Sequence, residues 1–291
     1  MDVYQSTIDY LLTFSIFDVW YEMETILRRA ASGRPRDWQL PVMACQALGE
    51  SPERAIPASA ARACAQISII LVDDILDEDP RGEYHRIGSG RAANFAVAFQ
   101  AVGAEALVRS QASTQVKVEA LNSLNQMMLK TAQGQDLDIQ NPADESSYWR
   151  VVKNKSAPFY GCALHLGALL GEASTYTARG LERLGEMIQI HDDLSETMAV
   201  PANPDWLQGL SPLPILFAQS VDHPDRARSL ELYQNISAEN ALQEAQDILN
   251  KTPLPNKGTV DSLIEAVITP VWKLFETLGI SPDVHLRLQD S

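Results

Sequence analysis

Apolar residues recur at intervals of three and four positions through most of this 291-residue chain, as at Phe95, Phe99, Val102 and Leu107. This spacing places them on one face of an α-helix. Alternating polar and apolar residues, which would indicate strands, are scarce. The pattern therefore predicts an all-α fold, and a hydrophobic content of 45% is enough to bury one large core.

Helix starts are marked where a capping side chain precedes a proline, at Ser51-Pro52, Asn141-Pro142 and Ser211-Pro212. Loops are expected near residues 80–90, 201–208 and 252–258. No compositional break separates the helical segments, so we expect residues 1–291 to form a single-domain antiparallel helix bundle. The predicted helices lie near residues 5–30, 38–48, 58–78, 91–109, 113–137, 143–171, 177–198, 212–220, 225–250 and 258–278.

Charge and composition exclude several classes of partner. The formal net charge of −15 disfavours binding to nucleic acid or to anionic lipid, because both require a basic surface. Apolar runs such as residues 67–72 are much shorter than the roughly 20 residues that span a bilayer. The N-terminus lacks the basic start of a signal peptide, and Cys45, Cys64 and Cys162 sit among apolar neighbours. We therefore expect a cytoplasmic protein without stable membrane insertion and with reduced, buried thiols.

Two acidic motifs each follow an apolar helical segment. Residues 73–77 read Asp-Asp-Ile-Leu-Asp, and residues 192–196 read Asp-Asp-Leu-Ser-Glu. Asp73 and Asp77 are four residues apart, which stacks them on one helix face. Clustered carboxylates repel one another, and divalent cations with oxygen ligands relieve that repulsion. Two such clusters predict magnesium bound together with a diphosphate, whereas one cluster alone would equally fit a solvated acidic helix face.

Further motifs occur in the order found in the trans-prenyl diphosphate synthases, also called polyprenyl synthetases. They are Ser-Gly-Arg-Pro-Arg at residues 32–36, Ala-Cys-Gln-Ala-Leu-Gly at 44–49, Gly-Gln-Asp-Leu-Asp at 134–138, Lys-Ser at 155–156 and Gln-Ile-His-Asp-Asp at 189–193. Each short match is weak, but five in order are fairly specific. The chain resembles a divergent member of this family. The resemblance implies the class I isoprenoid synthase fold with a central apolar cavity, and a homodimer.

The resemblance also assigns roles to the acidic residues. It implies that Asp73, Asp77 and Asp192 ligate magnesium, as a cluster of three ions with bound diphosphate. Asp74, Asp193 and Glu196 would complete the metal site through bound waters and neighbouring cations. With the metals, Lys155 would stabilise the charge that builds on the departing diphosphate.

Other residues match the substrate sites of the family. Lys155 and Arg81 match contacts to the allylic diphosphate, and Arg36 matches the isopentenyl diphosphate site, with Arg34 beside it. Gln66 lies where the family contacts isopentenyl diphosphate, although it also fits a satisfied core amide. Gln189 belongs to the second motif. The hydrocarbon tail would pass Ser68 and Ile69, where the absence of aromatic residues predicts room for roughly 20 carbons or more.

Departures from the family pattern leave the reaction open. Gly33 and Leu210 stand where the family usually has lysines, Glu196 replaces an aspartate, and only Arg81 follows the first motif directly. The first hypothesis is a prenyltransferase that condenses an allylic diphosphate with isopentenyl diphosphate. The second is a class I terpene synthase or unusual prenyltransferase that ionises the allylic diphosphate without isopentenyl diphosphate. The third is a noncatalytic partner subunit of a synthase.

Overall fold

The computed structural model describes residues 1–141, 144–172, 213–220, 222, 224–237 and 240–251. Within these residues all regular secondary structure is helical and no strand occurs, which confirms the predicted all-α fold. The predicted helices near 177–198 and 258–278 lie outside them. In chain order the α-helices are α1 (Val3–Leu11), α2 (Ser15–Val19), α3 (Tyr21–Ser32), α4 (Leu40–Ala47), α5 (Ile56–Leu76), α6 (Tyr84–Ile87), α7 (Ser89–Val108), α8 (Thr114–Asp138), α9 (Glu145–Leu170), α12 (Leu213–Ser220), α13 (Arg226–Gln234) and α14 (Ala241–Lys251), with 3-10 turns at Arg36–Gln39 and Pro52–Ala55.

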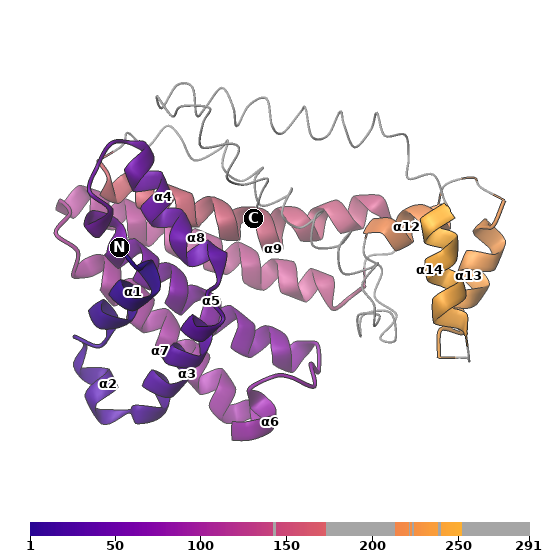
Figure 1. Ribbon diagram of the computed structural model, residues 1–291, viewed down its shortest axis with the longest axis horizontal. Coiled ribbons are helices and arrows are strands. Elements are labelled where there is room, and N and C mark those ends of the chain that lie inside the picture. Colours follow the sequence, from indigo (N-terminus) through magenta and orange to yellow (C-terminus); the bar gives the residue numbers. More distant parts are fainter. Residues whose placement is uncertain (142–143, 173–212, 221, 223, 238–239, 252–291) are drawn as a thin grey trace.

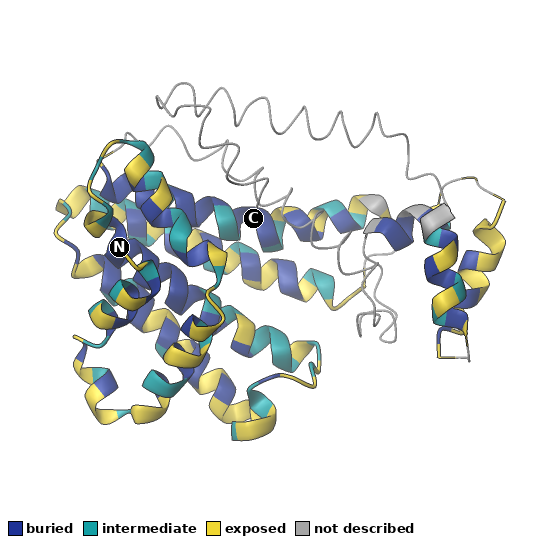
Figure 2. Cartoon of the chain, viewed as in Figure 1, coloured by how far each residue is buried: buried dark blue, intermediate teal, exposed yellow. Residues whose placement is uncertain are grey.

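The long helices α5, α7, α8 and α9 form the body of the bundle, and the short helices α1 to α3 lie along one side of it (Figure 1). Small residues on α5, including Ala61 and Cys64, are fully buried and permit close packing. Gly103 of α7 has this role on the partner helix, because a Cβ there would lie 3.1 Å from Cβ of Cys64. Burial is concentrated where these helices meet, and exposed residues gather at α6 and in the loops (Figure 2).

The segment Pro52–Leu76 is long and apolar enough to cross a membrane by length and composition, with a mean hydropathy of 1.6 over its most apolar stretch. In the described structure 72% of that stretch is buried inside the protein. A core helix of a bundle satisfies the same criterion, so this feature is accounted for by packing against α7, α9 and α1.

Two predicted helices are divided. The segment 5–30 contains α1, α2 and α3, because Phe14 and Trp20 turn inward: Phe14 is 1% exposed, and the Trp20 ring lies 4.8 Å from that of Phe95. The segment 225–250 contains α13 and α14. Asn235 ends α13 and Asn240, with a φ of +66°, precedes α14, and asparagine tolerates that left-handed conformation better than most residues. Tertiary burial and turn chemistry override the helical periodicity at both places.

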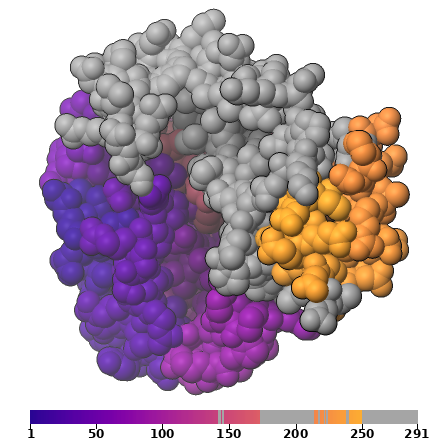
Figure 3. All heavy atoms as spheres, turned by 45° about the vertical axis from the view of Figure 1, so that its right-hand side comes forward, coloured from indigo at the N-terminus to yellow at the C-terminus, as the bar shows by residue number. Residues whose placement is uncertain are grey.

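Helices α12 to α14 have a small core of their own, formed by Ile215, Leu232, Ile236, Ala241, Ala245 and Ile248. Leu216 of α12 packs on Tyr148 and Val152 at the start of α9. In the space-filling view the surface of α13 and α14, in orange and yellow, lies apart from that of the N-terminal helices, in indigo and purple (Figure 3). The bundle and this smaller cluster are thus joined along α9.

Candidate active site

The first acidic motif lies where α5 leaves the core. Leu71 is buried, whereas the side chain of Asp73 keeps 28% of its surface exposed. Helix α5 ends at Leu76, and Asp77 then donates its backbone N–H to the carbonyl of Asp73 at 2.8 Å. A helix that is buried for most of its length therefore presents its carboxylates at one end of the bundle.

Helix α8 contributes an amide to this cluster. Nε2 of Gln135 donates a hydrogen bond to Oδ1 of Asp73, and Gln135 is otherwise buried. Asp138 lies one turn further along α8 and faces Lys155 of α9. Sequence reasoning gave Gln135 and Asp138 no role, although residues 134–138 were recognised as a family motif. Gln135 and Asp138 follow buried Thr131 by four and seven positions. This spacing was the sequence signal that the three residues share one face of the helix.

Lys155 joins the three helices. Its Nζ lies 2.6 Å from Oδ2 of Asp138 and 3.4 Å from Oδ1 of Asp73. Burial by itself lowers the pKa of a lysine, but the charges of Asp138, Asp73 and Asp77 outweigh burial and raise the pKa of Lys155. The side chain is therefore a fixed cation beside the first motif. The structure thus brings together Asp73, Asp77 and Lys155, three residues predicted to be catalytic.

The close approach of α8 and α9 depends on Gly134. A Cβ at this position would lie 2.5 Å from the backbone N of Lys155 and 2.7 Å from the carbonyl carbon of Asn154. Thr131, one turn earlier, donates its hydroxyl to the carbonyl of Lys155 at 3.4 Å. Glycine thus allows the two backbones to touch, which places Lys155 within reach of Asp138.

The remaining carboxylates of the first motif are crowded. Burial, followed by the charges of Asp79 and Asp73, raises the pKa of Asp74 to about 6. A cation bound nearby would favour the ionised carboxylate, and oxygen ligands of this kind suit a hard divalent ion such as magnesium.

The described residues contain no complete group of three metal ligands. The second motif, with Gln189, Asp192, Asp193 and Glu196, lies outside the described residues.

Arg81 follows the first motif on an exposed loop. Its guanidinium pairs with Asp79 through two contacts, Nε to Oδ1 at 3.0 Å and Nη2 to Oδ2 at 2.7 Å. The charge of Arg81 also contributes to the electrostatic surroundings of Asp74, where it opposes the raised pKa. Arg81, which was predicted to contact the allylic diphosphate, therefore lies near the first motif. In the described structure its guanidinium pairs with Asp79.

The basic loop, residues 32–36, connects α3 to the 3-10 turn that begins at Arg36. Gly33 ends α3 with a φ of −71°, and a Cβ built there meets only the carbonyl oxygen of Ala30, at 3.5 Å. Arg34 adopts a φ of +47°, and Nη1 of its guanidinium lies 3.4 Å from Oδ2 of Asp2. The two arginines of the loop, Arg34 and Arg36, are both exposed.

Gln66 lies next to this loop on α5. Its carbonyl oxygen accepts a hydrogen bond from Nε1 of Trp38 at 2.5 Å, and its Nε2 donates to Oδ1 of Asp37 at 3.1 Å. Asp37 in turn pairs with Arg62 at 2.9 Å, with both side chains buried. In this arrangement Gln66 has the partners that a satisfied core amide requires, and its predicted contact with substrate stays a prediction.

Ser68 and Ile69 lie on α5 between Gln66 and the acidic motif. Ser68 is 4% exposed, and Ile69 is partly buried against the main core. They lie five and four residues before Asp73, and the predicted passage of a hydrocarbon tail along them stays a prediction. Ile70, the next residue, is 46% exposed and lies on the outer face.

An all-α bundle with an aspartate-rich helix end beside a partly buried lysine has the architecture of the class I isoprenoid synthases. A family model described as polyprenyl synthetase matches residues 32–251. The chain therefore belongs to the polyprenyl synthetase family, which confirms the resemblance inferred from its motifs.

Relatives and solved structures agree with this assignment. The chain is 26% identical over 207 residues to a geranylgeranyl diphosphate synthase of Methanosarcina mazei, covering 67% of this chain and 64% of that protein. It is also 26% identical over 237 residues to a dimethylallyltranstransferase of Mycobacterium tuberculosis, covering 77% and 72%. The alignment thus spans slightly less than two thirds of the Methanosarcina protein.

Two solved structures share the fold. A geranylgeranyl pyrophosphate synthetase from Pyrococcus horikoshii has a TM-score of 0.72 at 19% identity, covering 96% of this chain and 89% of that one. A polyprenyl synthase from Caulobacter crescentus, complexed with calcium and isoprenyl diphosphate, has a TM-score of 0.67 at 17% identity, covering 94% and 92%. These likenesses confirm the all-α isoprenoid synthase fold.

Proposed function

We propose that the protein is a prenyltransferase that condenses an allylic diphosphate with isopentenyl diphosphate, giving a trans-prenyl diphosphate of about 20 carbons. The observation that carries this proposal is the contact of Asp73 with Gln135 and Lys155 at the end of α5. Membership of the polyprenyl synthetase family and relatives named geranylgeranyl diphosphate synthase support it.

The residues at this end of the bundle have separable tasks. Carboxylates Asp73, Asp74 and Asp77 would hold magnesium, and a relative complexed with calcium and isoprenyl diphosphate supports a divalent cation. Together with the second motif these carboxylates would hold three magnesium ions, which would supply Lewis-acid stabilisation of the leaving diphosphate. Lys155 adds a fixed positive charge beside the diphosphate, and Gln135 orients Asp73.

We expect the purified protein to incorporate labelled isopentenyl diphosphate into a longer product when magnesium and an allylic primer are present. Excess chelator should abolish turnover, because uncompensated carboxylates repel a diphosphate. The measurement is product identification after incubation with primers of several lengths. Undiminished turnover in chelator would contradict the metal assignment.

The same assay separates the alternatives. Pyrophosphate release with a hydrocarbon or alcohol product that contains no label would identify a terpene synthase-like reaction. Position 33 is a glycine where the family usually has a lysine, and this observation favours the terpene synthase-like reaction as the second candidate. No pyrophosphate release under any condition would favour a noncatalytic partner subunit.

Replacing Ser68 with phenylalanine should shorten the main product or the longest accepted primer. The larger ring would fill space below Asp73 that the hydrocarbon tail needs, and each methylene excluded removes about 0.8 kcal/mol of burial. Ile70→Phe, on the exposed side of the same turn, is the matched control and should leave the product length unchanged. An unchanged product distribution in a folded, active Ser68→Phe variant would place the tail elsewhere.

Replacing Gly33 with lysine should lower the KM for isopentenyl diphosphate by about tenfold, because a charge-assisted contact contributes roughly 1.5–3 kcal/mol and 1.4 kcal/mol is tenfold. The site accepts a side chain, since Gly33 has an ordinary helical conformation and an added Cβ makes only a normal contact. Gly33→Met, with similar length and no charge, should leave this KM unchanged. Equal KM values in the two variants would show that position 33 does not face the isopentenyl site.

We also propose a homodimer in the cytoplasm. The family assignment supports the dimer. The three free and buried cysteines, Cys45, Cys64 and Cys162, fit a reducing compartment. Sedimentation of the purified protein tests the dimer.

A further inference from the structure

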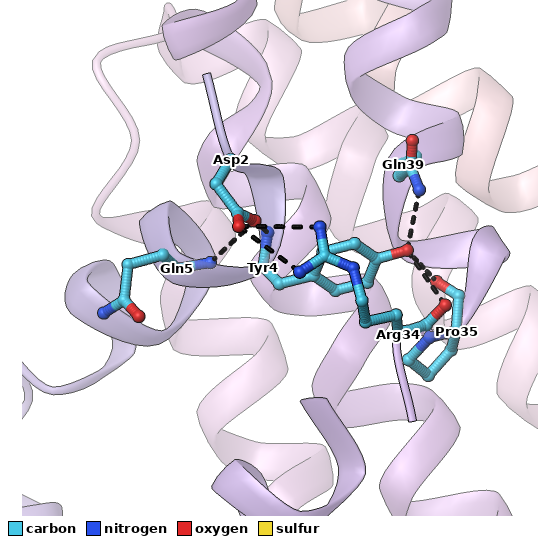
Figure 4. Close-up of polar contacts among 6 residues, drawn as sticks. All are labelled: Asp2, Tyr4, Gln5, Arg34, Pro35 and Gln39. Atoms are coloured by element: carbon cyan, nitrogen blue, oxygen red, sulfur yellow. Dashed lines mark hydrogen bonds and ion pairs between the residues drawn. The ribbon is translucent and has the colours of Figure 1, made fainter. Parts of the chain in front are cut away.

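The basic loop is held by the N-terminal helix through one tyrosine. Oη of Tyr4 donates to the backbone carbonyls of Arg34, at 3.0 Å, and Pro35, at 3.2 Å. The same oxygen accepts a hydrogen bond from Nε2 of Gln39 at 2.7 Å, so the hydroxyl proton is directed toward the two carbonyls. Figure 4 shows Tyr4 between Gln39 and the loop, with its hydroxyl at the centre of these contacts.

The side chain of Arg34 closes over the ring of Tyr4. Its guanidinium carbon lies 4.4 Å from the ring centroid, and the guanidinium also pairs with Asp2, which caps the start of α1. Tyr4 itself is 5% exposed. Tyr4, the second residue of α1, is thus a buried aromatic residue that contacts both the backbone and the side chain of the loop.

The loop needs such support because its backbone is strained. Arg34 has a φ of +47°, a left-handed conformation that is unfavourable for a side chain of this kind and persists where surrounding contacts impose it. Beyond the loop, Asp37 is tied to α5 through its buried pair with Arg62. The segment that carries Arg36 is therefore anchored on α1 before it and on α5 after it.

We propose that Tyr4 is a positioning residue for isopentenyl diphosphate, acting through the backbone of the basic loop that presents Arg36. The inference rests on the proposed function and on the family resemblance, which assigns Arg36 of this loop to isopentenyl diphosphate. Tyr4 does not touch substrate. It holds the carbonyls of Arg34 and Pro35 so that the loop keeps one conformation when the diphosphate arrives.

The test is Tyr4→Phe, which removes the hydroxyl and keeps the ring. We expect the KM for isopentenyl diphosphate to rise about five- to tenfold, as loss of one such hydrogen bond allows, while kcat and the KM for the allylic diphosphate stay within about twofold. The matched control is Tyr10→Phe on the same helix, whose hydroxyl donates to the carbonyl of Ala106 at 2.9 Å, on α7. That variant should leave all three constants unchanged.

A second variant, Gln39→Met, removes the donor that orients the Tyr4 hydroxyl and should raise the same KM by a smaller factor. The inference is overturned if this KM is unchanged in both Tyr4→Phe and Gln39→Met, or if Tyr10→Phe raises it equally. A parallel change of kcat and both KM values in Tyr4→Phe would also overturn it, because that pattern indicates general loss of structure. Failure of the unmodified protein to incorporate isopentenyl diphosphate would instead defeat the proposed function, and this inference with it.

Discussion

Replacing Asp73 with alanine is expected to lower turnover of the allylic diphosphate by about a thousandfold while the helical content stays nearly unchanged. A metal ligand of this kind supports several kcal/mol of transition-state stabilisation, and about 1.4 kcal/mol corresponds to tenfold in rate. The substitution also removes the acceptor of Gln135 and the Asp73 carboxylate beside Lys155, while the ion pair of Lys155 with Asp138 is kept. Steady-state pyrophosphate release, with circular dichroism of the same sample, measures both quantities.

The matched control is Asp136→Ala. Asp136 lies next to Gln135 on α8, but it is exposed and belongs to the outer face of the helix. Its removal changes the net charge by the same amount and should leave turnover close to that of the unmodified protein. Near-normal turnover in a folded Asp73→Ala variant would remove the basis for placing the metals at the end of α5.

Replacing Gly134 with alanine is expected to destabilise the protein by about 2–3 kcal/mol, because the added methyl group would meet backbone atoms of α9 that cannot rotate away. Molecules that remain folded should also turn over about a hundredfold more slowly. The reason is that α9 must shift to admit the methyl group, and an ångström of displacement at a catalytic group has an effect of that order. Denaturant unfolding and kcat at saturating substrate measure the two effects.

Gly90→Ala provides the comparison for Gly134→Ala. Gly90 lies in the first turn of α7, and a Cβ built there meets nothing within 4 Å. Alanine has the higher helix propensity, so this variant should match or slightly exceed the stability of the unmodified protein. If Gly134→Ala retains full stability and full kcat, the contact between α8 and α9 does not position Lys155.

Local sequence signals predicted much of this fold. Apolar spacing and helix-start signals placed the helices now seen as α5, α7, α8 and α9 within a few residues of their ends. The start signal at Asn141 was wrong in detail: α9 begins at Glu145, and its cap is Asp144, whose side chain accepts from the backbone N–H of Ser147. The division of residues 5–30 was missed, since it depends on the burial of Phe14 and on the packing of partly buried Trp20 against Phe95, which is distant in sequence.

The candidate site was also predicted only in part, because local sequence patterns do not specify contacts between helices. Asp73 and Asp77 were predicted from spacing on one helix, and Lys155 was assigned through the family motif. The contacts of Lys155 with Asp138, and of Tyr4 with the basic loop, join residues 17 and about 30 positions apart. Such pairs follow from the packing of whole helices, which no local pattern specifies. Gln135 carried a visible polar spacing, yet only the structure shows that its partner is Asp73.

Helix α5 has two roles in the molecule: its first part packs in the core, and its end presents the carboxylates of the first acidic motif. Its 21 residues extend about 30 Å from the packed alanines at its start to the carboxylates at its end. Because α5 is one continuous helix in a closely packed core, we expect a shift of its buried part to displace Asp73 as well. We therefore expect a substitution in the buried part of α5, such as Ser68→Phe, to change thermal stability and metal affinity together with product length, so that selection on any one of these properties constrains the other two.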